Sequence, residues 1–139
     1  MSVTEALKSL EIGDTIPDLV TDPITHDQLA RFAAASGDHN PIHRDEDAAK
    51  AGGLPGIIAH GMLNMAALGL VLTGWVPQSA VRRFSARFVA MTFPGDTLTL
   101  SGTITGRAAE VGEDQVTLDL EARNQKGETI LKGAATIAL

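Results

Sequence analysis

The sequence predicts an α+β fold in which a curved antiparallel β-sheet wraps around one apolar helix. Residues 60–75 carry an apolar side chain at almost every position, a pattern typical of a helix enclosed by protein. The second half of the chain instead alternates apolar and polar residues, as strands with one buried face do. A length of 139 residues is typical of one domain, so we expect residues 1–139 to form a single unit.

The first half of the chain is expected to contain an amphipathic helix with clear end signals. Thr25 and Gln28 fit a capping box, in which the Thr25 hydroxyl accepts the Gln28 amide and the Gln28 side chain reaches back. Apolar residues follow at helical spacing from Leu29, and Gly37 ends the helix.

Residues 37–59 form an irregular segment rich in glycine and proline. A short helix is expected inside it, from Asp45 to Ala51, with Asp45 as its cap. Irregular segments of this length are usually functional. The helix at 60–75 follows directly, and we expect its two methionines, Met62 and Met65, to lie in the core.

Four strands are expected in the second half, over residues 83–90, 97–104, 116–123 and 129–139. Turn signals stand at Pro94–Asp96 and at Asn124–Gly127. Strands joined by short turns pair with their neighbours in sequence, so we expect a four-stranded antiparallel meander.

Composition excludes several classes of function. The chain has no cysteine, which excludes disulfides, thiolate metal sites and a cysteine nucleophile. Its net charge of −6 is opposite to that of a typical nucleic-acid-binding domain. No apolar run approaches the roughly 20 residues of a membrane span, and the first residues lack the apolar core of a signal peptide. We therefore expect a soluble, cytoplasmic protein with no nucleic-acid or membrane partner.

The irregular segment contains a candidate acid–base pair, Asp38 and His43. Gly37 allows a sharp turn after the preceding helix, and Pro41 is expected to keep the segment non-helical. A carboxylate beside an imidazole is a common general acid–base pair, because histidine titrates near neutral pH. By composition alone, the alternative is that Asp38 caps a turn and His43 lies on the surface.

His39 and His43 have the spacing of a possible metal site. Two histidines at this spacing bind zinc from one face of a helix, and Pro41 blocks that geometry. We therefore expect no metal and assign His39 no role.

Residues 32–45, with a Gly-Asp-x-Asn-Pro-x-His core at 37–43, resemble the hydratase motif of the MaoC-like, (R)-specific enoyl-thioester hydratases. The resemblance continues over most of the chain, at Ala59–Met62, Arg87–Phe88 and Pro94–Leu98. It implies a hot-dog fold. Within this family, the length and the helix end at Thr73–Val76 are similar to the catalytic subunit of mycobacterial-type (3R)-hydroxyacyl-carrier-protein dehydratases.

The resemblance also implies a chemistry, that of a hydro-lyase. Asp38 and His43 would hold and activate a water that adds to C3 of a trans-2-enoyl thioester, and dehydration would reverse this path. The amide of Gly61, at the start of the central helix, would bind the thioester carbonyl oxygen. Asn40 would fix the loop through backbone hydrogen bonds, and His60 would brace the helix start. No cofactor is expected beyond the coenzyme A or acyl carrier protein that bears the substrate.

The family resemblance implies a pair of hot-dog chains in fatty acid metabolism, either a homodimer or a heterodimer. Four arginines at positions 82, 83, 87 and 107 form a basic stretch that could meet the phosphates or acidic face of the carrier. The alternative is that they line a solvated face of the sheet or pair with acidic residues elsewhere. Some family members carry a serine on the central helix, where this chain has Ala66 and Gly69.

Two other functions remain open. A hot-dog thioesterase would be expected to use a carboxylate on or near the central helix, and residues 60–75 contain none. A non-catalytic hot-dog subunit would be expected to lack the Asp38–His43 pair, which this chain has.

Overall fold

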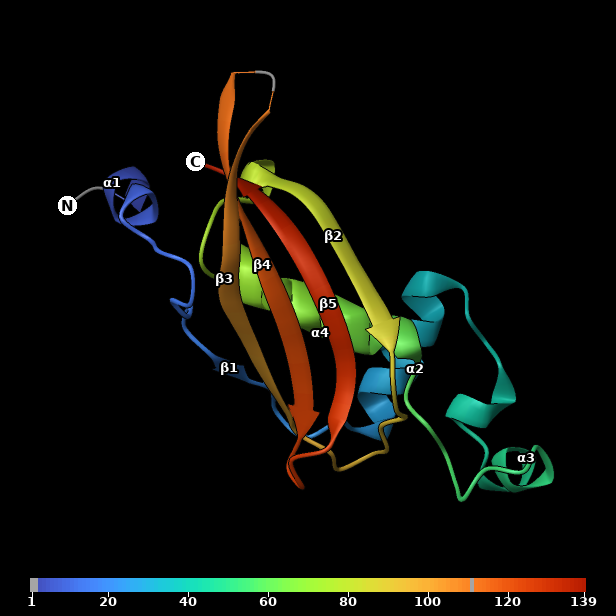
Figure 1. Cartoon of the computed structure of the whole chain (residues 1–139). Helices are drawn as coiled ribbons and strands as arrows, with labels where there is room; N and C mark the ends of the chain where they lie inside the picture. Colours follow the sequence, from blue (N-terminus) through green and yellow to red (C-terminus); the bar gives the residue numbers. More distant parts are fainter. Residues whose placement is uncertain (1–2, 111) are drawn as a thin grey trace.

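The computed structural model describes residues 3–110 and 112–139 and shows a curved antiparallel sheet lying across a long helix (Figure 1). In chain order the elements are α1 (Val3–Lys8), β1 (Leu19–Val20), α2 (His26–Ser36), the 3-10 turn η1 (Pro41–His43), α3 (Glu46–Ala51), α4 (Gly61–Thr73), the 3-10 turn η2 (Gln78–Ala80), β2 (Val81–Phe88), β3 (Leu98–Glu110), β4 (Glu113–Asn124) and β5 (Thr129–Ala138). This is the α+β, hot-dog architecture that the sequence predicts.

The order of the strands differs from the prediction. The sheet runs β1-β3-β4-β5-β2, so β3, β4 and β5 form a meander while β2 pairs with β5 at one edge. Residues 89–97 join β2 to β3, and this connection is longer than the usual hairpin loop of about 2–5 residues. The connection does not form a hairpin and passes the turn between β4 and β5. There Gln125 accepts a hydrogen bond from the Thr97 amide and donates one to Asp96. The predicted four-stranded meander is therefore wrong for its first strand.

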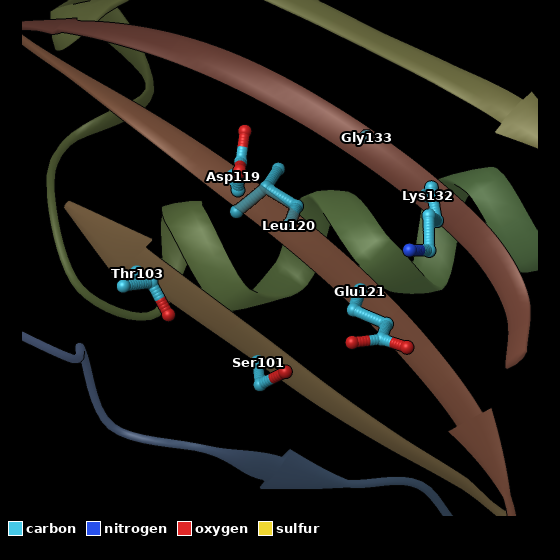
Figure 2. Close-up of a pocket in the computed structure, with 7 residues that line it drawn as sticks. All are labelled: Ser101, Thr103, Asp119, Leu120, Glu121, Lys132 and Gly133. Carbon is cyan, nitrogen blue, oxygen red and sulfur yellow. The ribbon is translucent and has the colours of Figure 1, made fainter. Parts of the chain in front are cut away.

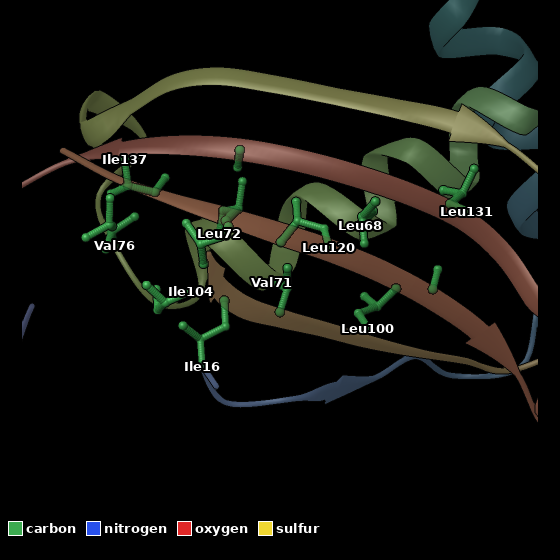
Figure 3. Packing of buried hydrophobic residues seen from close by; sticks show 14 of the residues in the cluster. Ile16, Leu68, Val71, Leu72, Val76, Leu100, Ile104, Leu120, Leu131 and Ile137 are labelled. Carbon is green, nitrogen blue, oxygen red and sulfur yellow. The ribbon is translucent and has the colours of Figure 1, made fainter. Parts of the chain in front are cut away.

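The main core lies between α4 and the inner face of the sheet (Figure 3). Leu68 and Leu72 from α4 are fully buried against Leu100 and Leu120 from the strands. Gly133 on β5 permits this close approach, because a Cβ there would lie 3.1 Å from Leu68 Cδ2 and only 2.6 Å from the Ser85 carbonyl oxygen. The alternating strands and the apolar helix therefore bury one another.

One face of α4 remains uncovered, which corrects the expectation of a fully enclosed helix. Met62, Ala66 and Leu70 lie one turn apart on this face and are exposed, with Met62 57% and Leu70 54% accessible. The expectation that Met62 lies in the core is wrong. No helix within residues 3–110 and 112–139 has both the length and the hydropathy to cross a membrane.

Local sequence signals set the ends of the shorter helices. Thr25 Oγ1 accepts the Gln28 amide at 3.0 Å at the start of α2. Gly37 ends α2 in the left-handed conformation at φ 80°, which glycine adopts without strain. Asp45 caps α3 by accepting the amides of the second and third helical residues. The caps predicted at Thr25, Gly37 and Asp45 are thus confirmed, whereas the reciprocal bond predicted from the Gln28 side chain to the Thr25 amide does not form.

The N-terminal helix α1 was not predicted, and it is fastened to the sheet by Arg107. The Arg107 guanidinium on β3 donates to the carbonyl oxygen of Lys8 at 2.6 Å and to that of Leu10 at 3.0 Å. These carbonyls lie at the C-terminal end of α1, where a cation is favourable. Arg107 therefore has a structural role.

Candidate active site

The loop after α2 holds the Asp38 carboxylate through short-range hydrogen bonds. Asp38 Oδ1 accepts the Asn40 amide at 3.2 Å, and Asn40 Oδ1 accepts the Ile42 amide at 3.2 Å. Asn40 thus bonds to backbone, as the sequence suggests. Pro41 does not keep the segment non-helical but starts the 3-10 turn η1, because proline is well suited to a first helical position.

This 3-10 turn directs His43 toward Asp38. The His43 Nε2 and Asp38 Oδ2 atoms lie 3.7 Å apart. His43 Nδ1 lies 2.7 Å from the carbonyl oxygen of Ile58, which can only accept, so the ring proton is on Nδ1. The lone pair of Nε2 therefore faces the carboxylate. The His43 side chain is 9% exposed and that of Asp38 52%, so a buried base lies beside a carboxylate that solvent reaches.

His60 connects this loop to the start of α4. It is the N-cap residue of the helix and is 1% exposed. Its ring stacks on the His43 ring, with centroids 3.8 Å apart and an interplanar angle of 24°. His60 Nε2 lies 3.1 Å from the Asp38 carbonyl oxygen. One side chain therefore contacts both members of the pair.

Gly61 begins α4 beside the two histidines. Its amide has no hydrogen bond within residues 3–110 and 112–139, as expected at a helix N-terminus, where the backbone also supplies positive potential. A Cβ at Gly61 would lie 3.1 Å from Cε1 of Phe88, at the end of β2. The Phe88 ring thus lies against the helix start, which is still exposed, and a side chain at position 61 would push the ring aside.

A pocket of about 310 Å³ reaches His43 and Gly61, whereas Asp38 and His60 lie behind His43, outside the pocket lining. It is lined by His43, Ile58, Ala59, Gly61, Asn64, Phe88, Val89, Ala90 and Met91. His43 and the start of α4 form a polar wall, and residues 88–91 form an apolar wall. Phe88, Val89 and Met91 are about half exposed at its rim. The pocket suits a ligand that has a polar reacting group next to an apolar chain.

Asn64 and Thr92 support this pocket, and sequence reasoning missed both. Asn64 Nδ2 donates to Thr92 Oγ1 at 2.9 Å, and the Thr92 hydroxyl lies 3.1 Å from Asn64 Oδ1. The Thr92 carbonyl accepts the Ala59 amide at 2.9 Å. The pair ties α4 to the apolar wall. A lone amide side chain in an otherwise apolar helix was the signal that could have identified Asn64.

Asp38, His43 and His60 offer possible metal-ligand atoms within 4.8 Å of one another. The geometry does not favour a shared ion. Lone pairs lie in the ring planes, and stacked, nearly parallel rings cannot both direct one at an ion about 2 Å from each nitrogen. His60 Nε2 is also engaged by the Asp38 carbonyl. The three residues therefore fit a hydrogen-bonded cluster better than a metal site.

A second pocket, of about 230 Å³, lies on the opposite face of the sheet (Figure 2). Its polar lining, which includes Asp119, Glu121 and Lys132, points away from α4. The sheet separates it from the Asp38–His43 pair, so it forms no part of that site.

The basic stretch predicted from the sequence is partly neutralised. Arg82 donates to Glu113 through Nε at 3.0 Å and Nη2 at 2.6 Å. The hydrogen bonds from Arg82, and a further one from Gln115, lower the pKa of Glu113. The same contact with Glu113 raises the pKa of Arg82. Arg107 fastens α1, as described above. Arg83 and Arg87 have no side-chain partner in the described part of the chain, and they project from β2 on the outer side of the sheet, opposite Phe84.

Comparisons with known proteins agree with this architecture. Residues 9–126 match the family described as MaoC like domain. The chain is 31% identical over 137 residues to the fatty acid synthase subunit beta of Saccharomyces cerevisiae, which covers 94% of this chain and 6% of that protein. It is 45% identical over 65 residues to 3-hydroxyacyl-thioester dehydratase X of Mycobacterium tuberculosis, covering 47% of this chain and 22% of that protein.

The chain thus spans less than a quarter of each of these two relatives. Among solved structures, the (R)-hydratase from A. caviae involved in PHA biosynthesis superposes with a TM-score of 0.77 at 30% identity. That match covers 95% of this chain and 98% of the other, so the two have nearly the same extent.

Proposed function

The chain belongs to the MaoC-like domain family, and on that premise we propose that it is an (R)-specific enoyl-thioester hydratase, or in reverse a (3R)-hydroxyacyl-thioester dehydratase. The observation that carries the proposal is that two lone-pair acceptors, Asp38 Oδ2 and His43 Nε2, face each other across 3.7 Å at the edge of a pocket. The similarity to an (R)-hydratase of the same extent supports it.

The water to be added would bridge these two acceptors from one side, because a gap of 3.7 Å is too short to hold a water on the line that joins them. Two acceptors cannot bond to each other, whereas a water molecule has two O–H donors and can serve both. Transfer of one of its protons to the pair leaves an oxygen nucleophile directed at C3 of the substrate, and a proton is then delivered to C2. One O–H bond of water breaks while C3–O and C2–H bonds form. The reaction is redox-neutral, and we propose that it uses no cofactor and no metal.

The start of α4 stabilises the negative charge that develops on the thioester oxygen. Addition at C3 of a conjugated thioester moves electron density onto the carbonyl oxygen. The Gly61 amide is free to donate to that oxygen, and the helix N-terminus adds favourable potential. We assign Gly61 to the oxyanion site and the apolar wall formed by Phe88 and Met91 to the acyl chain.

The carrier is coenzyme A or an acyl carrier protein, and both present phosphate near the thioester. Arg83 and Arg87 have no side-chain partner in the described part of the chain, but they lie on the outer face of the sheet, so they would meet such phosphates only where the carrier passes around the edge strand β2.

We further propose that the active unit is a pair of hot-dog chains, either two copies of this one or this chain with another. Met62, Phe88, Val89 and Met91 are exposed apolar residues beside the pocket. Strand β2 is also an edge strand of the sheet. A partner chain would cover both and complete the pocket wall. Light scattering of the purified chain is expected to give the mass of a dimer, and a stable monomer that is fully active would contradict the proposal.

The activity is tested with trans-2-enoyl thioesters of increasing length on both carriers. Hydration removes the conjugated double bond, so the enoyl absorbance falls and a (3R)-hydroxyacyl thioester accumulates. A thiol reagent in a parallel assay distinguishes a thioesterase, which would release free thiol without loss of the double bond. Unchanged absorbance with every substrate, both alone and with a candidate partner chain, would overturn the proposal and favour a non-catalytic subunit.

A further inference from the structure

We propose that His60 is a positioning residue that holds Asp38 and His43 in their reactive arrangement from two sides at once. This inference rests on the proposed function of that pair. His60 does more than brace the helix start, because its ring contacts both residues and is 1% exposed.

The first contact fixes the backbone of Asp38. The Asp38 carbonyl oxygen can only accept, so His60 Nε2 carries the proton and donates it across 3.1 Å. Asp38 Oδ1 is itself held by the Asn40 amide. These two hydrogen bonds fix the Asp38 backbone and its Oδ1 atom, so the other carboxylate oxygen, Oδ2, is directed toward His43.

The second contact fixes the ring of His43. Its Nδ1 is held by the Ile58 carbonyl oxygen, but a single hydrogen bond leaves the ring free to rotate about that axis. The His60 ring lies against it with centroids 3.8 Å apart. On its own side, His60 meets the edge of Phe32, with centroids 4.9 Å apart at 61°, so it cannot move away. The stack therefore prevents His43 from rotating.

His60 Nδ1 is buried and has no hydrogen-bond partner in the described part of the chain, so the contact of Nε2 with the Asp38 carbonyl oxygen is the polar contact that orients the ring.

Two substitutions separate the two contacts. His60→Gln keeps an N–H donor near the position of Nε2 but removes the ring, and His60→Phe keeps the ring but removes the donor. We expect each to lower kcat for enoyl hydration by about 10- to 100-fold, because a misplacement of about 1 Å in a reacting group costs that much. KM should change by less than about twofold, because His60 lies outside the pocket lining. His26→Gln, at an exposed histidine on α2, is the matched control and should leave both constants unchanged.

If folded His60→Gln keeps kcat within twofold of wild type, the stack on His43 does not position that ring. If folded His60→Phe does so, the hydrogen bond to Asp38 does not position the aspartate. A rise in KM at unchanged kcat in the variants would overturn both parts of the inference. If one variant fails to fold, the other still tests the proposal. Side-chain nitrogen NMR of the wild-type protein tests it independently of activity. We expect the proton on Nε2 of His60 and on Nδ1 of His43, and the opposite tautomer of His60 would contradict the proposal. An inactive wild type that shows these tautomers would overturn the hydratase function instead.

Discussion

The acid–base loop and the β-sheet are built in opposite ways. The loop from Gly37 to His43 includes four polar residues and is held by hydrogen bonds over two or three positions. Its long-range hydrogen bonds reach residues 58 and 60. Strands β3, β4 and β5 pair along most of their length and bury leucine and isoleucine against α4. In the proposed mechanism the loop supplies the reacting groups, and the sheet provides the buried core against which α4 packs.

The two regions meet on one helix. The start of α4 presents Gly61 to the pocket, and its later turns place Leu68 and Leu72 in the core. This arrangement predicts that substitutions in the loop affect activity with little loss of stability, and that substitutions in the sheet do the reverse. The predictions below test this separation, beginning with the largest expected effect.

Replacing the aspartate of the pair should nearly abolish activity. Asp38→Asn removes the negative charge that helps to accept a proton from water, and general acid–base groups contribute about 10²- to 10⁴-fold to rate. Its side chain is 52% exposed, so the melting temperature should hardly change. Steady-state kinetics and thermal melts check both statements. Asp119→Asn, an exposed carboxylate on the outer face of the sheet, is the matched control.

A truncation in the sheet should show the opposite pattern. Leu118 on β4 is 1% exposed, and Leu118→Ala should lower the free energy of unfolding by about 2–5 kcal/mol through lost burial and a cavity. Urea denaturation measures this change. The remaining folded protein should keep its kcat, and Ile12→Ala, at a 70% exposed position, should change stability little. A large loss of kcat in folded Leu118→Ala would contradict the separation of the two regions.

The Asn64–Thr92 pair lies between the two regions, so its loss should affect both. Thr92→Val leaves the buried Asn64 amide without its partner, which should cost about 1–3 kcal/mol of stability and lower activity as the apolar wall moves. The double variant Asn64→Leu, Thr92→Val removes both polar groups. It should recover part of the stability in urea unfolding but not the activity. Equal destabilisation by the single and double variants would argue against the pair.

The smallest effect is expected at the Arg82–Glu113 pair, which joins β2 to β4. Hydrogen bonds from Arg82 lower the pKa of Glu113 in the folded state. The pair therefore stabilises the fold above the ordinary pKa of a glutamate, about 4.5, and this contribution is lost as the pH falls through the lower folded-state pKa. Thermal melts of wild type and Glu113→Gln should differ slightly near neutral pH and converge in acid. A difference that grows in acid would contradict this account.

Much of the structure could be predicted because its signals are local. The caps at Thr25 and Asp45, the stop at Gly37 and the alternating strands each depend on neighbouring residues. The motif containing Asp38 and His43 was found for the same reason, since its turn is short and its hydrogen bonds are internal.

The features that were missed depend on residues distant in sequence. Strand β2 pairs with β5 because a long connection crosses the β4–β5 turn, and no local pattern encodes that path. The stack of His60 on His43 and the bonds between Asn64 and Thr92 likewise join segments that meet only after folding. The exposure of Met62 likewise depends on tertiary structure, because composition cannot show that α4 packs against a sheet on one side alone.

The most direct test of the central claim is chiral analysis of the product that the wild-type chain forms from a short trans-2-enoyl-CoA. The account predicts loss of the enoyl absorbance and accumulation of the (3R)-hydroxyacyl thioester, with Asp38→Asn forming almost none. Formation of the (3S) product, or equal activity in Asp38→Asn, would contradict the assignment of the Asp38–His43 pair to water addition.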